Sequence, residues 1–355
     1  MDYSNYQFSF GKHNEKDVIW ITFPNLYDLR IKLKERFPSA KWSATNKAWY
    51  LPDLPSVRDA LVLPPKAIES KKHNQLSAEN YKALQNFINQ LELKAYSKNT
   101  IRLYVQEFSS LLILLKNIPV DSLTPERLKD YFLYVLKKDK LKEQTMNGKI
   151  NAIKFYFEQV LHRPRMFFDI PRPKTAQTLP KMLTKKQVSK LFSVVTNPKH
   201  LVMLKLCYGM GLRVSEIVNL KIEDIDSESF RVLIAGAKGK KDRYVQLPQS
   251  ILDDLRVYYK MYRPKIWLFE GEYKGQYSTR SVQMVFKNAM KKANITKTIG
   301  IHGLRHSYAT HLIEAGADIR YLKELLGHNS IKTTQIYTHV TDVSIAKIKS
   351  PLDSL

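Results

Sequence analysis

Residues 300–316 have the sequence GIHGLRHSYATHLIEAG. Side chains three residues apart share one face of a helix, so His302 and Arg305 are predicted to address one anion together. A metal site is the alternative, since His302 and His306 stand four residues apart and His311 follows. No glutamate follows His302 as in zinc hydrolase helices, and the chain has a single cysteine. We therefore favour the anion site and interpret His306 and His311 as packed or surface residues.

A second segment with candidate site residues is CYGMGLRVSEIVNLKIEDID, residues 207–226. Gly209 and Gly211 bracket a break in the chain, and Arg213 stands where a new helix is predicted to begin. An arginine beside so tight a turn can direct its guanidinium toward a ligand. The alternative is a surface ion pair between Arg213 and Glu216. This segment taken alone leaves both interpretations open.

A third segment, LGHNSIKTTQIYTHV at residues 326–340, carries a histidine and a tyrosine. Gly327 is predicted to end a helix and to turn His328 toward a site. A short helix that runs through Gln335 would then deliver Tyr337. The chain has 20 tyrosines, so Tyr337 becomes a candidate only because the other segments converge with it.

The fourth candidate segment is SFRVLIAGAKGKKDRYVQLP, near residues 228–248, whose alternation and Gly-Lys turn predict a β-hairpin or a three-stranded sheet. Lys238 in this turn could contact a phosphate or protonate a leaving oxygen. Together the four segments suit attack on a phosphodiester without a metal ion. Arginines hold the non-bridging oxygens, and the Tyr337 oxygen attacks to give a covalent phosphotyrosine. A free tyrosine has a pKa of about 10, so the nucleophile needs such a cationic site.

Composition narrows the class of partner. The 355 residues carry a formal net charge of +25, which makes nucleic acid the leading partner. The sequence is 44% hydrophobic and has no apolar run near the ~20 residues of a membrane span, so we expect a soluble, cytoplasmic protein without a membrane partner. The N-terminus lacks a signal pattern. The single cysteine, Cys207, is interpreted as a buried thiol.

The chain divides into segments of different character. Residues 1–64 combine a strand-like DVIWITF, a helix near LYDLRIKLKERF and a hairpin that turns at Thr45–Lys47, which predicts a small α+β domain. Trp42 and Trp49 are placed there either to pack or to stack on DNA. Residues 169–183 contain three prolines without apolar periodicity and are predicted to be a basic linker. Residues 184–355 form a second helical domain with the small sheet, and Thr184 is its first N-cap.

Residues 74–168 are predicted to form a bundle of about four helices. Ser97 and Thr124 are predicted N-caps, the second followed by proline at the first helical position. The polar faces of the bundle carry basic side chains that could follow a phosphate backbone, with ordinary solvation as the alternative. These candidate DNA-binding residues are Lys98, Arg102, Lys149 and Lys154. The predicted fold class is thus mainly α with a small β-sheet.

At these positions the chain resembles the tyrosine recombinases of the phage integrase and Xer family. The matching stretches are GLRVSE, GAKGKKDR, HGLRH, LLGHNS and IYTHV. The resemblance assigns the catalytic positions, in family order within residues 97–340, to Arg213, Lys238, His302, Arg305, His328 and the nucleophile Tyr337. It gives Glu216 a supporting role. The turn also offers Lys240 and Lys241 as weaker candidates for the catalytic lysine.

The resemblance implies a helical core-binding domain and an α+β catalytic domain that clamp double-stranded DNA. It further implies a homotetramer on two synapsed sites, a Holliday junction, no cofactor or metal, and accessory DNA-bending or directionality proteins as further partners. Residues 1–64 resemble an added domain of integrases from mobile elements and could bind arm-site DNA or a protein. The rival functions are a type IB topoisomerase and a DNA-binding regulator without chemistry. The filled active-site set argues against the regulator.

Overall fold

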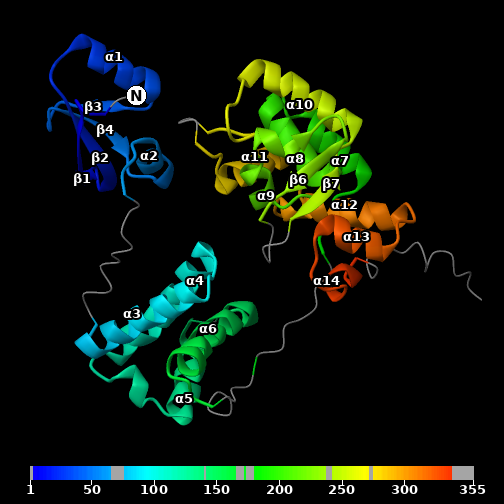
Figure 1. Cartoon of the computed structure of the whole chain (residues 1–355). Helices are drawn as coiled ribbons and strands as arrows, with labels where there is room; N and C mark the ends of the chain where they lie inside the picture. The colour runs from blue at the N-terminus through cyan, green and yellow to red at the C-terminus, as the bar shows by residue number, and fades with distance from the viewer. Residues whose placement is uncertain are drawn as a thin grey trace, which may run out of the picture. The chain divides into compact units, whose positions relative to one another are not determined.

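The computed structural model describes residues 3–64, 76–139, 141–164, 172, 180–236, 242–271 and 275–337. The protein is mainly helical, with one four-stranded and one three-stranded antiparallel sheet (Figure 1). Backbone contacts divide the chain into residues 67–178 and a unit that takes in both flanks. Three separate clusters of buried apolar residues lie within 3–63, 76–161 and 183–304, so each part has its own core.

The N-terminal part is a small sheet with helices. Its elements are β1 (Gln7–His13), β2 (Lys16–Thr22), α1 (Tyr27–Arg36), β3 (Lys41–Ser43), β4 (Ala48–Pro52) and α2 (Pro55–Ala60), with strand order β1-β2-β4-β3. The predicted helix and hairpin are confirmed, since Ser43 pairs with Ala48 across the turn. Trp42 is 53% exposed, and its ring meets that of the half-buried Trp49 edge-on at 5.7 Å.

Residues 78–160 form the predicted bundle of four helices. These are α3 (Ala78–Leu93), α4 (Lys98–Leu115), α5 (Pro125–Asp139) and α6 (Glu143–Phe155), the last continued by a π-helical turn at Tyr156–Val160. Ser97 caps α4 by accepting the Thr100 amide, as predicted. The Thr124 hydroxyl accepts the Arg127 amide at 3.4 Å, with Pro125 at the first helical position. The two side chains therefore accept hydrogen bonds from backbone N–H groups that have no partner within the first turn of each helix.

A buried asparagine joins α3 to the connection that follows α4. Asn80 is fully buried, and its amide group donates to the carbonyl oxygens of Lys116 at 3.1 Å and Ile118 at 3.0 Å. Its side-chain oxygen accepts the Val120 amide at 2.9 Å. A buried polar group without a partner costs ~1–3 kcal/mol. The three hydrogen bonds of Asn80 therefore stabilise residues 116–120 against α3.

The third part, residues 180–337, is built around α8 and carries the three-stranded sheet. Its elements are α7 (Lys185–Ser193), α8 (Pro198–Gly209), α9 (Val214–Asn219), β5 (Ile225–Asp226), β6 (Arg231–Ile234), β7 (Arg243–Gln246), α10 (Gln249–Tyr262), α11 (Thr279–Lys292), α12 (His302–Glu314), α13 (Ile319–Leu326) and α14 (Lys332–Gln335). Thr184 caps α7 with a complete capping box, and the predicted sheet is confirmed. Helix α12 packs on α8 and α13, which places the candidate site residues together.

Two predictions fall largely outside the described residues. Of the linker at 169–183, the structure describes Arg172 and residues 180–183, and the tip of the hairpin at 237–241 is not described. None of the helices in the described ranges is both long and apolar enough to cross a membrane.

Replacing Asn80 with alanine is expected to lower the free energy of unfolding of the helical bundle by about 3 kcal/mol, because it leaves buried backbone groups without partners. Urea unfolding followed by circular dichroism would measure this, with hydrogen exchange assigning the transition to residues 76–160. The control is Asn99→Ala, which removes an exposed bond to Arg102 and should change the bundle's stability by less than ~0.5 kcal/mol. Equal effects of the two variants would contradict the assignment.

Candidate active site

Arg213 is the N-cap residue of α9 and is bound by the carboxylate of Glu216. Gly211 has φ +62°, and a Cβ there would lie 2.5 Å from the Tyr308 ring, so the turn before α9 requires glycine. The Arg213 amide donates to Glu216 Oε2 at 2.9 Å, and its Nη1 donates to Oε1 at 2.7 Å. The ion pair considered from the sequence thus forms. It lies inside the protein, however, because Glu216 is only 6% exposed.

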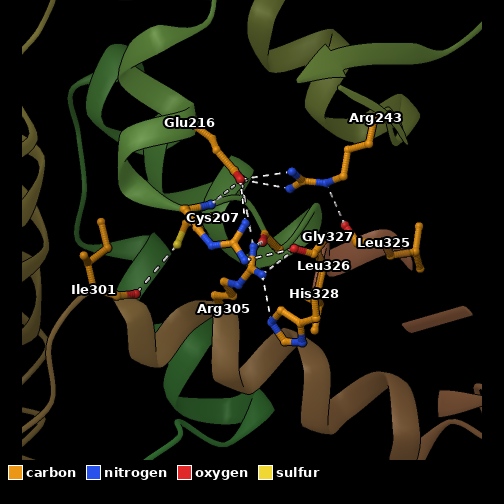
Figure 2. A network of polar contacts seen from close by, with 11 residues as sticks. Cys207, Glu216, Arg243, Ile301, Arg305, Leu325, Leu326, Gly327 and His328 are labelled. Carbon is orange, nitrogen blue, oxygen red and sulfur yellow. Dashed lines mark hydrogen bonds and ion pairs between the residues drawn. The ribbon is translucent and has the colours of Figure 1, made fainter. Parts of the chain in front are cut away.

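Arg243, which the sequence analysis did not single out, binds the same carboxylate (Figure 2). It is the first residue of β7, and its Nη1 and Nη2 donate to the two Glu216 oxygens at 3.0 and 2.8 Å. Its Nε donates to the Leu325 carbonyl at 3.3 Å. With 58 lysines and arginines in the chain, no local signal distinguishes Arg243, because its partners lie on α9 and at the end of α13.

The pKa of Glu216 reflects these two arginines. Burial alone would raise it, but the hydrogen bonds and charge of Arg243, and then the contacts with Arg213, outweigh burial and lower the pKa to about 2. Glu216 is therefore ionised at neutral pH and neutralises part of the positive charge of the site. The third arginine, Arg305, has its Nη1 3.9 Å from Glu216 Oε2.

Arg305 connects the break after α8 to the end of α13. It is 4% exposed, and its Nη1 donates to the Gly211 carbonyl oxygen. Its Nη2 donates to the Leu326 carbonyl oxygen (Figure 2). Burial, followed by repulsion from Arg213, lowers the pKa of Arg305 to about 10, so its guanidinium stays protonated at neutral pH. Arg213 and Arg305, which the sequence analysis expected at one site, thus both lie near the Glu216 carboxylate.

His328 follows a left-handed glycine cap at the end of α13, as the sequence predicted. Gly327 has φ +61°, and a Cβ there would lie 3.0 Å from the Arg243 guanidinium. Its carbonyl accepts Arg213 Nη2 at 3.2 Å. His328 Nε2 lies 3.2 Å from Arg305 Nη2, while its Nδ1 lies 2.9 Å from the Thr334 hydroxyl. Since arginine only donates, Nε2 accepts and Nδ1 carries the proton.

Burial, and then the charges of Arg305, Arg213 and Arg243, lower the pKa of His328 to about 4. The imidazole is therefore neutral at neutral pH. In this tautomer Nε2 accepts from Arg305, and the ring could donate to an anion through Nε2 only with its proton on that nitrogen.

Tyr337 lies two residues beyond the short helix α14 and is 1% exposed. Its ring packs with Ala309, Leu322 and Leu326 in a small apolar cluster. It is stacked with the His328 ring, with the planes 11° apart and the centroids 6.5 Å apart. Burial raises the pKa of Tyr337, and the charges of Arg305 and Arg213 act in the opposite direction. The phenol thus lies within the field of the arginines that the sequence predicted around it.

The hydroxyl of Tyr337 lies 2.9 Å from His306 Nδ1. The interpretation of His306 as a packed or surface residue missed this contact, because sequence spacing does not show which segment folds over α12. The interpretation of His311 is confirmed, since it is buried with its Nδ1 3.0 Å from the Tyr208 hydroxyl. In the described part of the chain, no group of three or more His, Cys, Asp or Glu side chains could hold a metal ion.

Of the two remaining predicted catalytic residues, the structure describes His302 but not Lys238. His302 is the first residue of α12, and its side chain is exposed. Lys238, with the alternatives Lys240 and Lys241, lies outside the described residues. The structure therefore describes five of the six positions predicted by resemblance, and Lys238 stays a prediction.

Cys207 lies beside the site but is chemically inert there. It is 1% exposed, and its thiol donates to the Ile301 carbonyl at 3.6 Å (Figure 2). Burial raises the pKa of the thiol to about 12, with the charge of Arg305 acting in the opposite direction. The predicted buried thiol is confirmed.

The candidate DNA-binding residues of the bundle differ in exposure. Lys98 and Arg102 are exposed on α4, and the half-buried Lys154 lies 3.4 Å from Glu158. Lys149 does not lie on the polar face as expected. It is 6% exposed, its Nζ is 2.7 Å from Glu107, and it donates to the Ser110 hydroxyl at 2.6 Å. These contacts occupy its ammonium group inside the bundle.

We expect Glu216→Gln to lower the free energy of unfolding at pH 7 by about 3 kcal/mol, the equivalent of a pKa depressed by roughly two units. The folded pKa of about 2 lies below the ordinary value of ~4.3, so the stabilisation is present above pH ~4.3. It is lost as the pH falls toward 2. Urea unfolding of the wild type and of Glu216→Gln would measure this. The difference between their free energies of unfolding should become smaller as the pH falls from 7 to 2.5.

The matched control is Glu223→Gln, because the ion pair of Glu223 with Lys221 is exposed. It should change stability little at any pH. A Glu216→Gln deficit that stays constant between pH 7 and 2.5 would contradict the ionic role of this carboxylate.

Comparison with known proteins shows the family of the chain. Residues 181–343 match the phage integrase family, and residues 83–165 match the phage integrase N-terminal SAM-like domain. Tyrosine recombinase XerA of Pyrococcus horikoshii is 38% identical over 270 residues, 74% of this chain and 90% of that protein. XerA of Pyrococcus furiosus is 39% identical over 271 residues, 73% of this chain and 89% of that protein.

Among solved structures, the Tn1549 transposon integrase in complex with circular intermediate DNA has a TM-score of 0.60 and 21% identity. The match covers 76% of this chain and 99% of that one, and it shows the same fold. The predicted family and fold class are thereby confirmed. The matched residues contain every described member of the site, from Arg213 to Tyr337. The chain therefore belongs to the phage integrase family and is a tyrosine-type site-specific recombinase.

Proposed function

We propose that this recombinase cleaves and rejoins double-stranded DNA through a 3'-phosphotyrosine on Tyr337, without a metal ion, and exchanges strands through a Holliday junction. The observation that carries the proposal is the meeting of Arg213, Arg305 and His328 beside the Tyr337 ring. A phosphodiester bound there would find two guanidinium groups, one neutral imidazole and a phenol.

The charges at the site support phosphate binding. Arg213, Arg243 and Arg305 surround a single carboxylate, that of Glu216, so a positive excess remains for an anion. Arg213 and Arg305 would donate to the non-bridging oxygens and offset the charge that builds in the transition state. His302 at the N-terminus of α12 is exposed and therefore open to the same phosphate.

The reaction conserves the energy of the phosphodiester bond. The Tyr337 oxygen attacks phosphorus, the bond from phosphorus to the 5' oxygen breaks, and the leaving oxygen takes a proton, for which Lys238 is the proposed donor. Attack by the 5' hydroxyl of a second strand reverses the step and releases Tyr337. No external energy source is needed.

Duplex DNA is the proposed substrate. The net charge of +25 favours a polyanion, and Lys98 and Arg102 present exposed cations on α4 of the bundle. The Tn1549 transposon integrase, which shares this fold, was solved in complex with DNA. We further propose that the protein acts as a homotetramer on two synapsed sites, assisted by accessory DNA-bending or directionality proteins. In this arrangement two duplexes are held together while strands are exchanged.

The relatives favour recombination over the rival functions. Those described above are named integrase or recombinase, and the match spans both the bundle and the catalytic part. A type IB topoisomerase would relax supercoiled DNA as a monomer and would give no recombinant product. A regulator without chemistry would not require the buried arginines of this site.

We expect Tyr337→Phe to abolish strand cleavage while DNA affinity changes less than about threefold, because the variant loses the attacking oxygen but few phosphate contacts. The measurement is covalent adduct formation on a nicked suicide substrate, with a gel shift for affinity. The wild type should form the adduct in excess EDTA. An adduct with the Phe variant, or a strict need for Mg²⁺, would overturn the proposed chemistry.

The N-terminal part, residues 3–64, lies outside both family matches. It has its own core and an exposed Trp42, which rests on Trp49 in a hollow of about 630 Å³ with Arg30 and Lys47 in its lining. Aromatic rings beside cations suit nucleic acid, so we propose that this part binds accessory arm-site DNA. Contact with a protein is the second candidate.

A chain that begins at Lys66 should therefore still cleave a core site but lose protection of the flanking sequences. Footprinting on a full recombination site, with the intact chain as reference, would measure this. Trp42→Ala in the intact chain should weaken the same flanking protection, because it removes the exposed ring without truncation. Footprints that both changes leave intact would instead point to a protein partner.

A further inference from the structure

The hydroxyl of Tyr337 has one side-chain partner in the described part of the chain, and that partner is His306. The Tyr337 oxygen lies 2.9 Å from His306 Nδ1, and the ring centroids are 5.6 Å apart. Apolar contacts with Ala309, Leu322 and Leu326 hold the ring of Tyr337 in place. The hydrogen bond with His306 therefore determines the direction of the hydroxyl hydrogen.

His306 differs in its contacts from the two histidines assigned by family resemblance. His302 stands one turn earlier on α12 and is exposed, and His328 is bonded to Arg305 and Thr334. Neither of them contacts the Tyr337 hydroxyl in the described part of the chain. His306 instead contacts the atom that would attack the phosphate.

The protonation states fit a donor phenol and an acceptor imidazole. Burial, and then the nearby His302 and Arg305, lower the pKa of His306, so the ring is neutral at neutral pH. Burial raises the pKa of Tyr337, so its phenol keeps its proton until it reacts. With the imidazole proton on Nε2, Nδ1 accepts the hydrogen bond from the phenol.

We propose that His306 is the proton acceptor that activates Tyr337 for strand cleavage. This inference rests on the proposed function, in which Tyr337 is the nucleophile. As the Tyr337 oxygen bonds to phosphorus, its O–H bond breaks and the proton moves to His306 Nδ1, which gives an imidazolium. The leaving 5' oxygen takes a different proton from the other side of the phosphorus. In religation the same imidazolium returns its proton to the departing Tyr337 oxygen.

The groups that face His306 explain why the proton does not move before DNA binds. The positive charge comes from Arg305 on α12, the titratable His302 and His328 also face the ring, and Arg213 acts on the phenol itself. These groups disfavour an imidazolium in the free protein. A bound phosphodiester brings negative charge among the arginines and removes that penalty. The acceptor would thus become effective only when substrate is present.

The experiment measures the rate of covalent adduct formation on a suicide substrate for the full-length wild type, His306→Ala and His306→Asn. Asparagine can keep a hydrogen bond to the phenol but cannot take its proton. Both variants are expected to react about 10²–10⁴-fold more slowly at pH 7, with DNA affinity within threefold of the wild type. The difference in rate between these variants and the wild type should become smaller as the pH is raised toward the pKa of Tyr337, because the phenol then ionises without a proton acceptor.

A second substrate, with a 5'-bridging phosphorothiolate, separates the two proton transfers, because its sulfur leaving group needs no proton. The His306 variants should stay equally slow on it. The matched control is His311→Asn, which removes the other histidine–tyrosine contact of α12, the one with Tyr208. This control should cleave at the wild-type rate.

Four outcomes would overturn the inference. Cleavage by His306→Asn at the wild-type rate would reduce His306 to a positioning residue, and rescue by the phosphorothiolate would assign it to the leaving group. Wild-type or faster cleavage by His306→Ala would mean that the contact only restrains Tyr337. If the wild type forms no adduct at Tyr337, the proposed function fails as well, whereas a wild-type adduct confines the failure to His306.

Discussion

The active site depends on one buried carboxylate that binds two guanidinium groups. Glu216 accepts hydrogen bonds from Arg213 on its own helix and from Arg243 on β7, and it lies within 3.9 Å of Arg305 on α12. Buried charges are costly to desolvate, so such an arrangement persists only when each ion has its partners. Because the three arginines would otherwise repel one another, the negative charge of Glu216 allows them to lie together.

Local rules predicted much of the framework. The N-caps at Ser97 and Thr184, the glycine cap at Gly327 and the hairpin before Ala48 all follow from interactions between residues near in sequence, which is why they could be identified. Helical spacing also placed His302 one turn before Arg305. The roles of these residues came from resemblance to a family, since spacing alone allows a metal site too.

Contacts between distant segments could not be predicted in this way. His306 meets Tyr337 31 residues further along, and Arg243 meets Glu216 27 residues earlier, so no periodicity encodes either pair. For Lys149 the sequence analysis was wrong, because it predicted an exposed side chain and the structure buries it. A lysine on an amphipathic helix is ordinarily solvated. Here Glu107 on a neighbouring helix makes its burial tolerable.

The anchors of the arginines also bear on how the sequence can vary. Arg305 is bound by the main-chain oxygens of Gly211 and Leu326, and Arg243 by that of Leu325. A backbone oxygen is present whatever side chain the residue carries, so exchanges at the two leucines leave these anchors in place if packing is kept. Inserting or deleting a single residue near the end of α13 would move the oxygens themselves. We therefore expect this segment to tolerate substitutions but not insertions or deletions.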